Sequence, residues 1–307
     1  MTTSDQDTQS GRKVVLVTGC SSGFGKLIAQ TLARAGHCVF ATMRGIADRN
    51  LEATDEFRRL AATERLNLEV VELDVASDAS VAHGVEQIVA AAGQIDVVVN
   101  NAGVSSSGPL EAFSVDQMAS LLNVNALGGM RVSKAVLGAM RARHSGQIIW
   151  MSSTLGRVLR GRGGLYPASK WATEGLAETL HYQVAPFGVD VTILEPDSYA
   201  TAHIYKSLVA EDAEITAAYT QATGPGPRMP TPDYRPDPQE VADAVQQLIE
   251  LPAGRRPLRM VVGPDFTDEV VEYNQTYERL RAHLAEVLSG PDKAAVWART
   301  KPRPPLP

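Results

Sequence analysis

Residues 14–25 read VVLVTGCSSGFG, in which a short β-branched run leads directly into a turn with three glycines. A helical segment follows at once. Glycines at a strand-to-helix turn let the chain bend tightly and bring backbone N–H groups close to a pyrophosphate, and the helix N-terminus adds partial positive charge. An ordinary turn can have the same composition, but its position between strand and helix favours a dinucleotide site. The predicted cofactor-binding residues of this turn are Gly19, Ser21, Ser22, Gly23, Phe24 and Gly25.

The alternation of short apolar runs with longer helical segments continues along the chain. Further strands are expected at 38–41, 68–73, 97–99, 148–151, 189–194 and 259–262, and helices at 26–35, 51–66, 80–92, 115–143, 166–187, 239–251 and 268–288. The strands are nearly continuous apolar runs, which is typical of a parallel sheet that helices cover on both faces. We therefore predict one α/β domain, a Rossmann-type three-layer αβα sandwich with a doubly wound parallel sheet of about seven strands.

The ends of the chain and one internal segment depart from this pattern. Residues 1–11 are mostly Thr, Ser, Asp and Gln and are expected to form a flexible leader to a domain at 12–290, with a proline-rich tail at 291–307. Six prolines between Gly224 and Pro238 exclude a helix or central strand there. We expect residues 199–236 to form a lid with two short amphipathic helices over the substrate, using Tyr199, Ile204, Tyr205, Leu208, Val209, Ile215 and Tyr219.

Composition narrows the possible partners. Lys and Arg total 29 against 35 Asp and Glu, a net charge of −6, which gives no electrostatic footprint for nucleic acid. The sequence has no apolar run long enough to span a membrane and no signal peptide, so a cytoplasmic location is expected. Two cysteines, Cys20 and Cys38, are too few for a disulfide framework. The six histidines lack metal-ligand spacing, and no metal site is predicted.

Five motifs occur in a recognisable order. They are Thr18-Gly-x-x-x-Gly-x-Gly, Asn100-Asn-Ala-Gly103, Asn125 in Asn-x-x-Gly, Ser152-Ser153, and Tyr166-x-x-x-Lys170. In order and spacing the chain resembles the short-chain dehydrogenase/reductase family, and its hydroxysteroid and retinol dehydrogenase-like branch, from Thr18 to Thr201. The resemblance implies a nicotinamide cofactor and hydride transfer at an alcohol or carbonyl carbon.

The predicted catalytic residues are Asn125, Ser153, Tyr166 and Lys170. Tyr166 and Lys170 lie four residues apart and so share one helix face. A free phenol has a pKa near 10. Positive charge from Lys170 and an oxidised nicotinamide would lower that pKa and make Tyr166 a general acid/base. The resemblance implies that Ser153 binds the substrate oxygen, with Ser152 as the competing candidate, and that Asn125 holds a water linking Lys170 to solvent.

The second strand predicts which nicotinamide cofactor is bound. It reads Val39-Phe-Ala-Thr-Met-Arg44 and has no acidic residue at its end to meet a ribose 2′-hydroxyl. Arg44, helped by Ser22, is therefore predicted to bind a 2′-phosphate, which favours NADP(H) over NAD(H); the alternative is a solvated arginine. By resemblance, further cofactor contacts come from Asp74, Val75, Asn101, Ala102, Gly103, Tyr166, Lys170, Pro196 and Thr201.

One position departs from the family pattern, because Asp197 stands where a glycine usually follows Pro196. Its carboxylate either stabilises the oxidised nicotinamide ring or points outward. Arg157, Arg160 and Arg162 follow Ser153 and either meet a substrate carboxylate or are solvated or at an interface.

The expected function is NADP(H)-dependent interconversion of a secondary alcohol and a ketone, or of an alcohol and an aldehyde. The substrate is expected to be bulky and largely apolar. By resemblance, the helices that begin near Val115 and Tyr166 would pair subunits in a homodimer or homotetramer. Two alternatives remain at this point: a non-catalytic dinucleotide-binding redox sensor, and a nucleotide-sugar epimerase or dehydratase.

Overall fold

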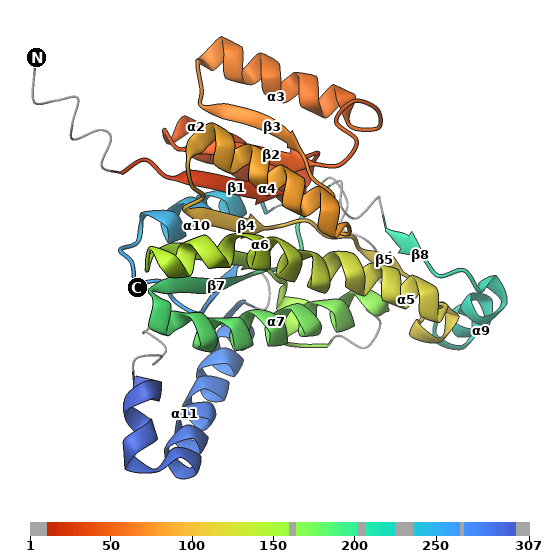
Figure 1. The fold of residues 1–307 in the computed structure, drawn as a ribbon. Coiled ribbons are helices and arrows are strands. Elements are labelled where there is room, and N and C mark those ends of the chain that lie inside the picture. The colour runs from red at the N-terminus through yellow and green to blue at the C-terminus, as the bar shows by residue number, and fades with distance from the viewer. Residues whose placement is uncertain (1–10, 160–163, 202–206, 225–235, 265–266, 299–307) are drawn as a thin grey trace, which may run out of the picture.

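A computed structural model describes residues 11–159, 164–201, 207–224, 236–264 and 267–298, with side chains to residue 285. Its centre is a sheet of seven parallel strands in the order β3-β2-β1-β4-β6-β7-β9 (Figure 1). The strands are β1 (Val14–Thr18), β2 (Cys38–Met43), β3 (Leu68–Glu72), β4 (Val97–Asn100), β6 (Gly146–Met151), β7 (Val189–Pro196) and β9 (Arg259–Val262). The predicted doubly wound parallel sheet is confirmed.

The strand order reverses at β1. The chain runs from β1 outward through β2 to β3, and then crosses back to β4 on the other side of β1. Because all strands are parallel, their carboxyl ends lie on one edge of the sheet, and the reversal opens a crevice there. This edge is where the chemistry-bearing motifs of the sequence come together.

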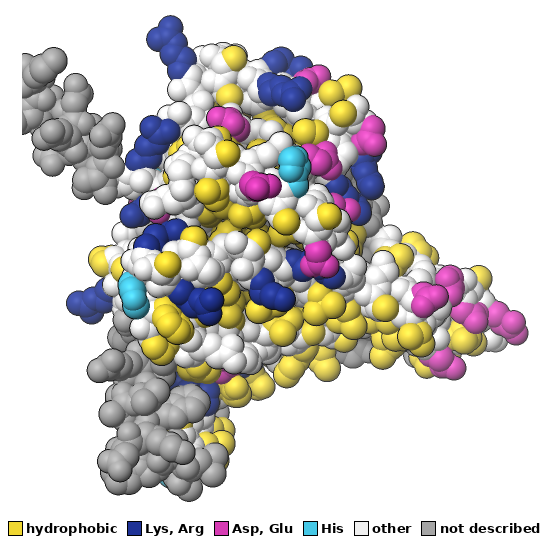
Figure 2. All heavy atoms as spheres, viewed as in Figure 1, with side chains coloured by type: hydrophobic (Ala, Val, Ile, Leu, Met, Phe, Trp, Pro, Cys, Tyr) yellow, Lys and Arg dark blue, Asp and Glu magenta, His cyan; other side chains and the backbone are white. Residues whose placement is uncertain are grey.

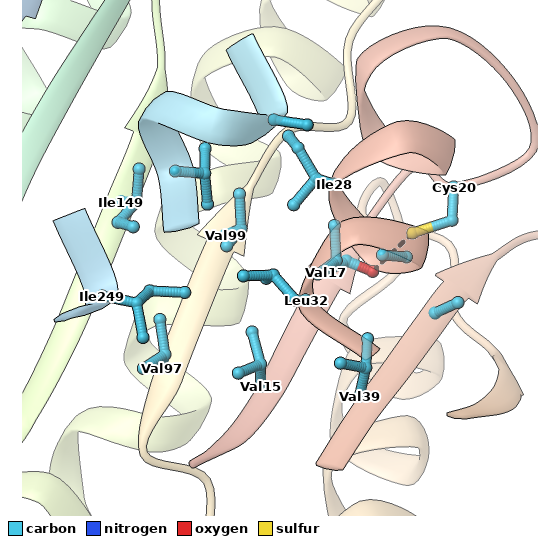
Figure 3. Packing of buried hydrophobic residues seen from close by; sticks show 14 of the residues in the cluster. Val15, Val17, Cys20, Ile28, Leu32, Val39, Val97, Val99, Ile149 and Ile249 are labelled. Atoms are coloured by element: carbon cyan, nitrogen blue, oxygen red, sulfur yellow. Dashed lines mark hydrogen bonds between the residues drawn. The ribbon is translucent and has the colours of Figure 1, made fainter. Parts of the chain in front are cut away.

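Helices cover both faces of the sheet because successive strand residues point in opposite directions. On one face Val15 and Val17 pack with α2 (Gly23–Arg34), α3 (Leu51–Glu64) and α10 (Gln239–Glu250) (Figure 3). On the other face Leu16 packs with α4 (Asp78–Ala92), α6 (Gly128–Ala142) and α7 (Leu165–Val184). The apolar runs of the sequence are thus shared between two cores, as the predicted three layers require.

The helix expected at 115–143 is divided into three parts. It consists of α5 (Val115–Leu122), a π-helical turn η2 (Asn123–Leu127) and α6. Single π turns inside α-helices are frequent at functional sites, because they shift the backbone hydrogen bonds by one residue. Here the turn contains Asn125, one of the predicted catalytic residues.

The expected lid differs from the structure in the parts that are described. Tyr199 is buried in the core against Phe24, with 5.4 Å between ring centroids and nearly perpendicular rings, so it does not cover a substrate. Leu208 and Val209 form a short strand, β8, parallel to β5 (Ser106–Ser107), and one helix, α9 (Ala213–Thr223), follows. The remaining lid residues 202–206 and 225–235, with Ile204 and Tyr205, lie outside the described residues.

The last helix, α11 (Thr267–Ala298), is longer than predicted. It runs beyond the expected end at residue 288 into the segment that we expected to be a proline-rich tail. Its first half packs beside β9 at the edge of the sheet. The helix leads away from the αβα body, and the dark blue last part of its ribbon turns back toward that body (Figure 1).

Candidate active site

A pocket of about 500 Å³ lies at the carboxyl ends of the strands, at the point where the strand order reverses. Sixteen of the eighteen predicted site residues line it: Gly19, Ser21, Ser22, Gly23, Phe24, Arg44, Asp74, Val75, Asn101, Ala102, Gly103, Ser153, Tyr166, Lys170, Pro196 and Thr201. The two others, Gly25 and Asn125, lie behind residues that do. The fold therefore brings together motifs that are spread over most of the chain.

The glycine turn has the geometry that a phosphate-binding turn needs. Gly19 and Gly23 have φ of 72° and 59°, a backbone region that favours glycine. A Cβ on Gly19 would come within 2.7 Å of the Cα of Ala102. Ser22 is the N-cap of α2, but its side chain makes no capping hydrogen bond and does not cover the first N–H groups of the helix. Those N–H groups are available to an anion in the pocket.

Asn101 directly follows β4, the neighbour of β1 in the sheet, and holds the glycine turn in place. Its Nδ2 donates to the carbonyls of Thr18 at 2.8 Å and Gly19 at 3.2 Å. The hydroxyl of Thr18 in turn accepts from the N–H groups of Asn101 and Ala102, both at 3.0 Å. Asn101 therefore fixes the shape of the turn in addition to lining the pocket.

Arg44 lies at the end of β2, at the mouth of the pocket. Its guanidinium is 3.7 Å from Asp74, and the two side chains are 47% and 32% exposed. An ion pair this long and this exposed contributes little, so Arg44 is free to turn toward a ligand. Glu72 accepts hydrogen bonds from the N–H groups of Gly45 and Ile46 at 2.7 and 2.9 Å, which fixes the loop that follows Arg44.

Tyr166, Ser153 and Lys170 form the inner end of the pocket. The phenol of Tyr166 is hydrogen-bonded with Ser153, and the Nζ of Lys170 lies 5.5 Å from the centroid of the phenol ring. Lys170 is 4% exposed, and its Nζ donates to the carbonyl of Met151 at 2.7 Å. The other serine, Ser152, has no hydrogen-bond partner for its Oγ among the described residues. The contact with Tyr166 favours Ser153 for the serine role.

Burial controls the protonation of this pair. Burial lowers the pKa of Lys170 to about 8, against an opposing effect of Glu174. Burial also raises the pKa of Tyr166, which the hydrogen bond with Ser153 only partly offsets. We expected the lysine charge to lower the phenol pKa; in the protein alone, loss of hydration is the larger effect.

Asn125 lies behind the pocket and organises it. Its Oδ1 accepts from the N–H of Val104 at 2.8 Å, and its Nδ2 donates to the Val104 carbonyl and the Ser169 hydroxyl, both at 2.9 Å. Val104 lines the pocket, and Ser169 precedes Lys170 on α7. The side chain of Asn125 thus joins the π turn to two segments of the site.

Asp197 and Arg157 are both buried. Asp197 lines the pocket at 7% exposure and accepts a hydrogen bond from the Thr154 hydroxyl at 3.3 Å, so the outward orientation is wrong. Arg157 is 5% exposed; its Nε donates to Asn274 at 2.7 Å, and its guanidinium stacks on Tyr273 and Tyr277. Arg157 is neither solvated nor in the pocket, because α11 covers it. Arg160 and Arg162 lie outside the described residues.

Sequence reasoning missed several residues that line the pocket. They are Met43, Arg49, Asn50, Leu73, Val104, Val124 and Met151. Arg49 is the most informative of them, since it adds a second cation near Arg44. A signal was present, because Arg49 lies in the polar loop between the second strand and its helix, but the direction of a loop side chain does not follow from periodicity.

The pocket fits a nicotinamide dinucleotide. The turn with two positive-φ glycines at the start of α2 suits a pyrophosphate, and the pocket continues from there to the Tyr166 phenol. Among the residues that the structure describes, no group of three or more His, Cys, Asp or Glu side chains is placed to hold a metal ion. No helix in the described part of the chain combines the length and apolar character that a membrane span needs.

A glycine turn at a topological switch point, with a Tyr, a Lys and a Ser at the inner end of the crevice, defines a dinucleotide-dependent oxidoreductase site of the short-chain type. Residues 13–212 match the family model for short chain dehydrogenases. The chain belongs to this family.

Three known proteins illustrate the similarity. Retinol dehydrogenase 8 of Bos taurus is 34% identical over 266 residues, 83% of each chain. The 3-ketodihydrosphingosine reductase of Bacteroides thetaiotaomicron is 36% identical over 189 residues, 62% of this chain and 65% of that protein, just under two thirds of its length. An alcohol dehydrogenase from Thermococcus sibiricus, solved with 5-hydroxy-NADP, superposes with a TM-score of 0.66 at 27% identity, covering 82% of this chain and 96% of that chain.

Proposed function

We propose that the protein is an NADP(H)-dependent oxidoreductase that interconverts a secondary alcohol and a ketone, or an alcohol and an aldehyde. The observation that carries the proposal is a single pocket that runs from the glycine turn and Arg44 to the hydrogen-bonded pair Tyr166 and Ser153. The relatives named for retinol and for 3-ketodihydrosphingosine act on long apolar molecules, which supports a bulky, largely apolar substrate.

Each residue at the inner end of the pocket has a separate role in proton transfer. A bound nicotinamide supplies or accepts the hydride. In the reducing direction Tyr166 donates its phenolic proton to the oxygen that develops negative charge, and Ser153 holds that oxygen by a hydrogen bond. Lys170 places an ammonium group near the phenol ring and stabilises the phenolate that remains. Burial excludes water, which strengthens each of these interactions.

The test of the chemistry is reduction of a panel of apolar ketones and aldehydes with NADPH. We expect Tyr166→Phe, which keeps the ring but removes the proton, to lower kcat by about 10² to 10⁴-fold. The variant should still bind NADPH, because the hydroxyl is not needed to fill the pocket. Full activity of Tyr166→Phe would refute the assignment of Tyr166 as the acid/base.

The test of the cofactor is fluorescence titration with NADPH and NADH. Loss of a guanidinium-phosphate contact in Arg44→Ala is expected to weaken NADPH binding about tenfold or more and to leave NADH binding nearly unchanged. Arg58→Ala is the matched control, since Arg58 is an exposed arginine on α3 away from the pocket. Equal affinity of the wild type for NADH and NADPH would overturn the NADP(H) preference.

We also propose that the protein forms a homodimer or homotetramer through α5, α6 and α7. Hydrophobic side chains gather over these helices (Figure 2). Val115, Leu127 and Trp171 remain 78%, 48% and 38% exposed, respectively. Contiguous exposed apolar surface of this kind is typical of a protein interface.

A further inference from the structure

A second cluster of charged side chains lies directly behind the active site on α7. Glu174 follows Lys170 by four residues, so the two side chains share one face of the helix. Both are buried, Lys170 at 4% and Glu174 at 2% exposure. The negative charge of Glu174 acts on Lys170 and opposes the effect of burial on the pKa of the lysine.

Arg259 on β9 connects Glu174 to the rest of the cluster. Its Nε lies 3.0 Å from an oxygen of Glu174 and 3.3 Å from an oxygen of Glu195 on β7. Its two other nitrogens contact Glu178 at 2.6 Å and Glu278 at 3.1 Å. One guanidinium therefore faces four carboxyl groups, of which Glu178 and Glu278 also pair with Arg281 on α11, at 4.0 and 2.9 Å.

The two innermost acids differ in their surroundings. Burial raises the pKa of Glu195, and the negative charge of Glu174 raises it further, while Arg259 opposes both effects. The carboxyl of Glu195 is 0% exposed and accepts a hydrogen bond from Asn274 at 2.7 Å. Two carboxylates this close are not both ionised at low cost. Burial and the neighbouring carboxyl group therefore both favour the neutral form of Glu195.

The segment after Ser153 packs directly on this cluster. A Cβ on Gly156 would lie 2.6 Å from the Oγ of Ser152, 3.2 Å from the Cγ of Glu174 and 3.3 Å from the carbonyl of Lys170. One oxygen of Glu174, Oε1, has no hydrogen-bond partner among the described residues. Arg259 therefore contacts only one of the two carboxylate oxygens of Glu174.

We propose, on the basis of the function proposed above, that Glu174 is a positioning residue that keeps Lys170 in its ammonium form at neutral pH. The phenol of Tyr166 needs that ammonium group, and a fully buried lysine without a counter-charge would lose its proton. Arg259, and α11 through Asn274, hold the carboxylate in place. The C-terminal helix thus takes part in setting the charge of the active site.

Several titratable or charged groups on the neighbouring elements surround Lys170 and Glu174 and influence the titration of Lys170. They are Tyr166 and Glu178 on α7, Glu195 and Asp197 at the end of β7, Arg259 on β9, Arg157 after β6, and Tyr277, Glu278 and Arg281 on α11. Of these, Glu195 provides the control: its replacement by Gln changes the packing around Arg259 but leaves the charge of Glu174 in place.

The direct test is the titration of Lys170 by NMR, using lysine labelled at the side chain in the full chain without cofactor. The sequence has seven lysines, so the Lys170 signal can be assigned by its loss in Lys170→Arg. We expect Glu174→Gln to raise the acid dissociation constant of Lys170 about tenfold or more. Glu195→Gln, which mimics a neutral acid on the same guanidinium, should leave it unchanged. An unchanged Lys170 titration in Glu174→Gln would overturn the proposal, and so would an equal change in both variants.

A kinetic readout follows if the protein reduces a carbonyl as proposed. The alkaline limb of kcat against pH should move to lower pH in Glu174→Gln and not in Glu195→Gln, whereas a purely structural role would lower kcat equally at all pH values. Should Glu174→Gln not fold, Glu174→Asp withdraws the charge by one methylene and should shift Lys170 in the same direction by less; no shift there would refute the proposal. The NMR titration needs no substrate, so failure of the proposed function cannot be mistaken for failure of this inference.

Discussion

At the scale of single residues, a position can require glycine for two reasons: its φ is positive, or a neighbouring atom leaves no space for a Cβ. Gly19 has positive φ and also lies against Ala102, whereas Gly36 has φ of 91° with nothing within 4 Å of a Cβ. Gly36→Ala should cost only the backbone strain, about 1–2 kcal/mol, and bind NADPH normally. Gly19→Ala should destabilise the fold further and weaken NADPH binding at least tenfold, because the turn must move away from Ala102. Thermal unfolding and fluorescence titration measure the two effects; equal NADPH affinity of both variants would contradict this account.

The predicted residues that proved to line the pocket are those whose positions are tied to a strand end or a helix turn. Gly19, Ser153 and Tyr166 occupy such positions, so once the strand order of the parallel sheet is known, these residues are expected to lie close together at one edge of it. Arg49 and Arg157 were missed or misplaced because their direction depends on a loop and on α11. The sequence has no local pattern that records those contacts.

At the scale of elements, Arg259 joins α7, β7, β9 and α11 by one buried guanidinium. Arg259→Met removes the positive charge and leaves buried carboxylates without a partner, which typically costs about 3–5 kcal/mol. The control is Arg34→Ala, which breaks the exposed pair with Glu64 at 2.8 Å and should cost about 0–1 kcal/mol. Urea unfolding of both variants checks the contrast. A loss below about 1 kcal/mol for Arg259→Met would show that the cluster relaxes or takes in water.

The elements themselves were largely predictable because each strand is an apolar run between turn residues. All seven predicted strands occur in the sheet. The π turn at Asn123–Leu127 was not predicted, since the apolar periodicity from Val115 to Arg143 continues through it. The β5–β8 pair was also missed, because two-residue strands carry no periodicity and pair only after the fold has brought them together.

At the scale of the whole molecule, the apolar surface over α5, α6 and α7 predicts the assembly. Leu127→Arg places a charge on this surface, between α5 and α6, and an unpaired charge buried between subunits is strongly unfavourable. We expect light scattering to give a dimer or tetramer for the wild type and a smaller mass for Leu127→Arg. Leu51→Arg is the matched control, because Leu51 is 44% exposed but lies on α3, and its mass should equal that of the wild type. A monomeric wild type would contradict the proposed assembly, and the exposed Val115, Leu127 and Trp171 would then need another explanation.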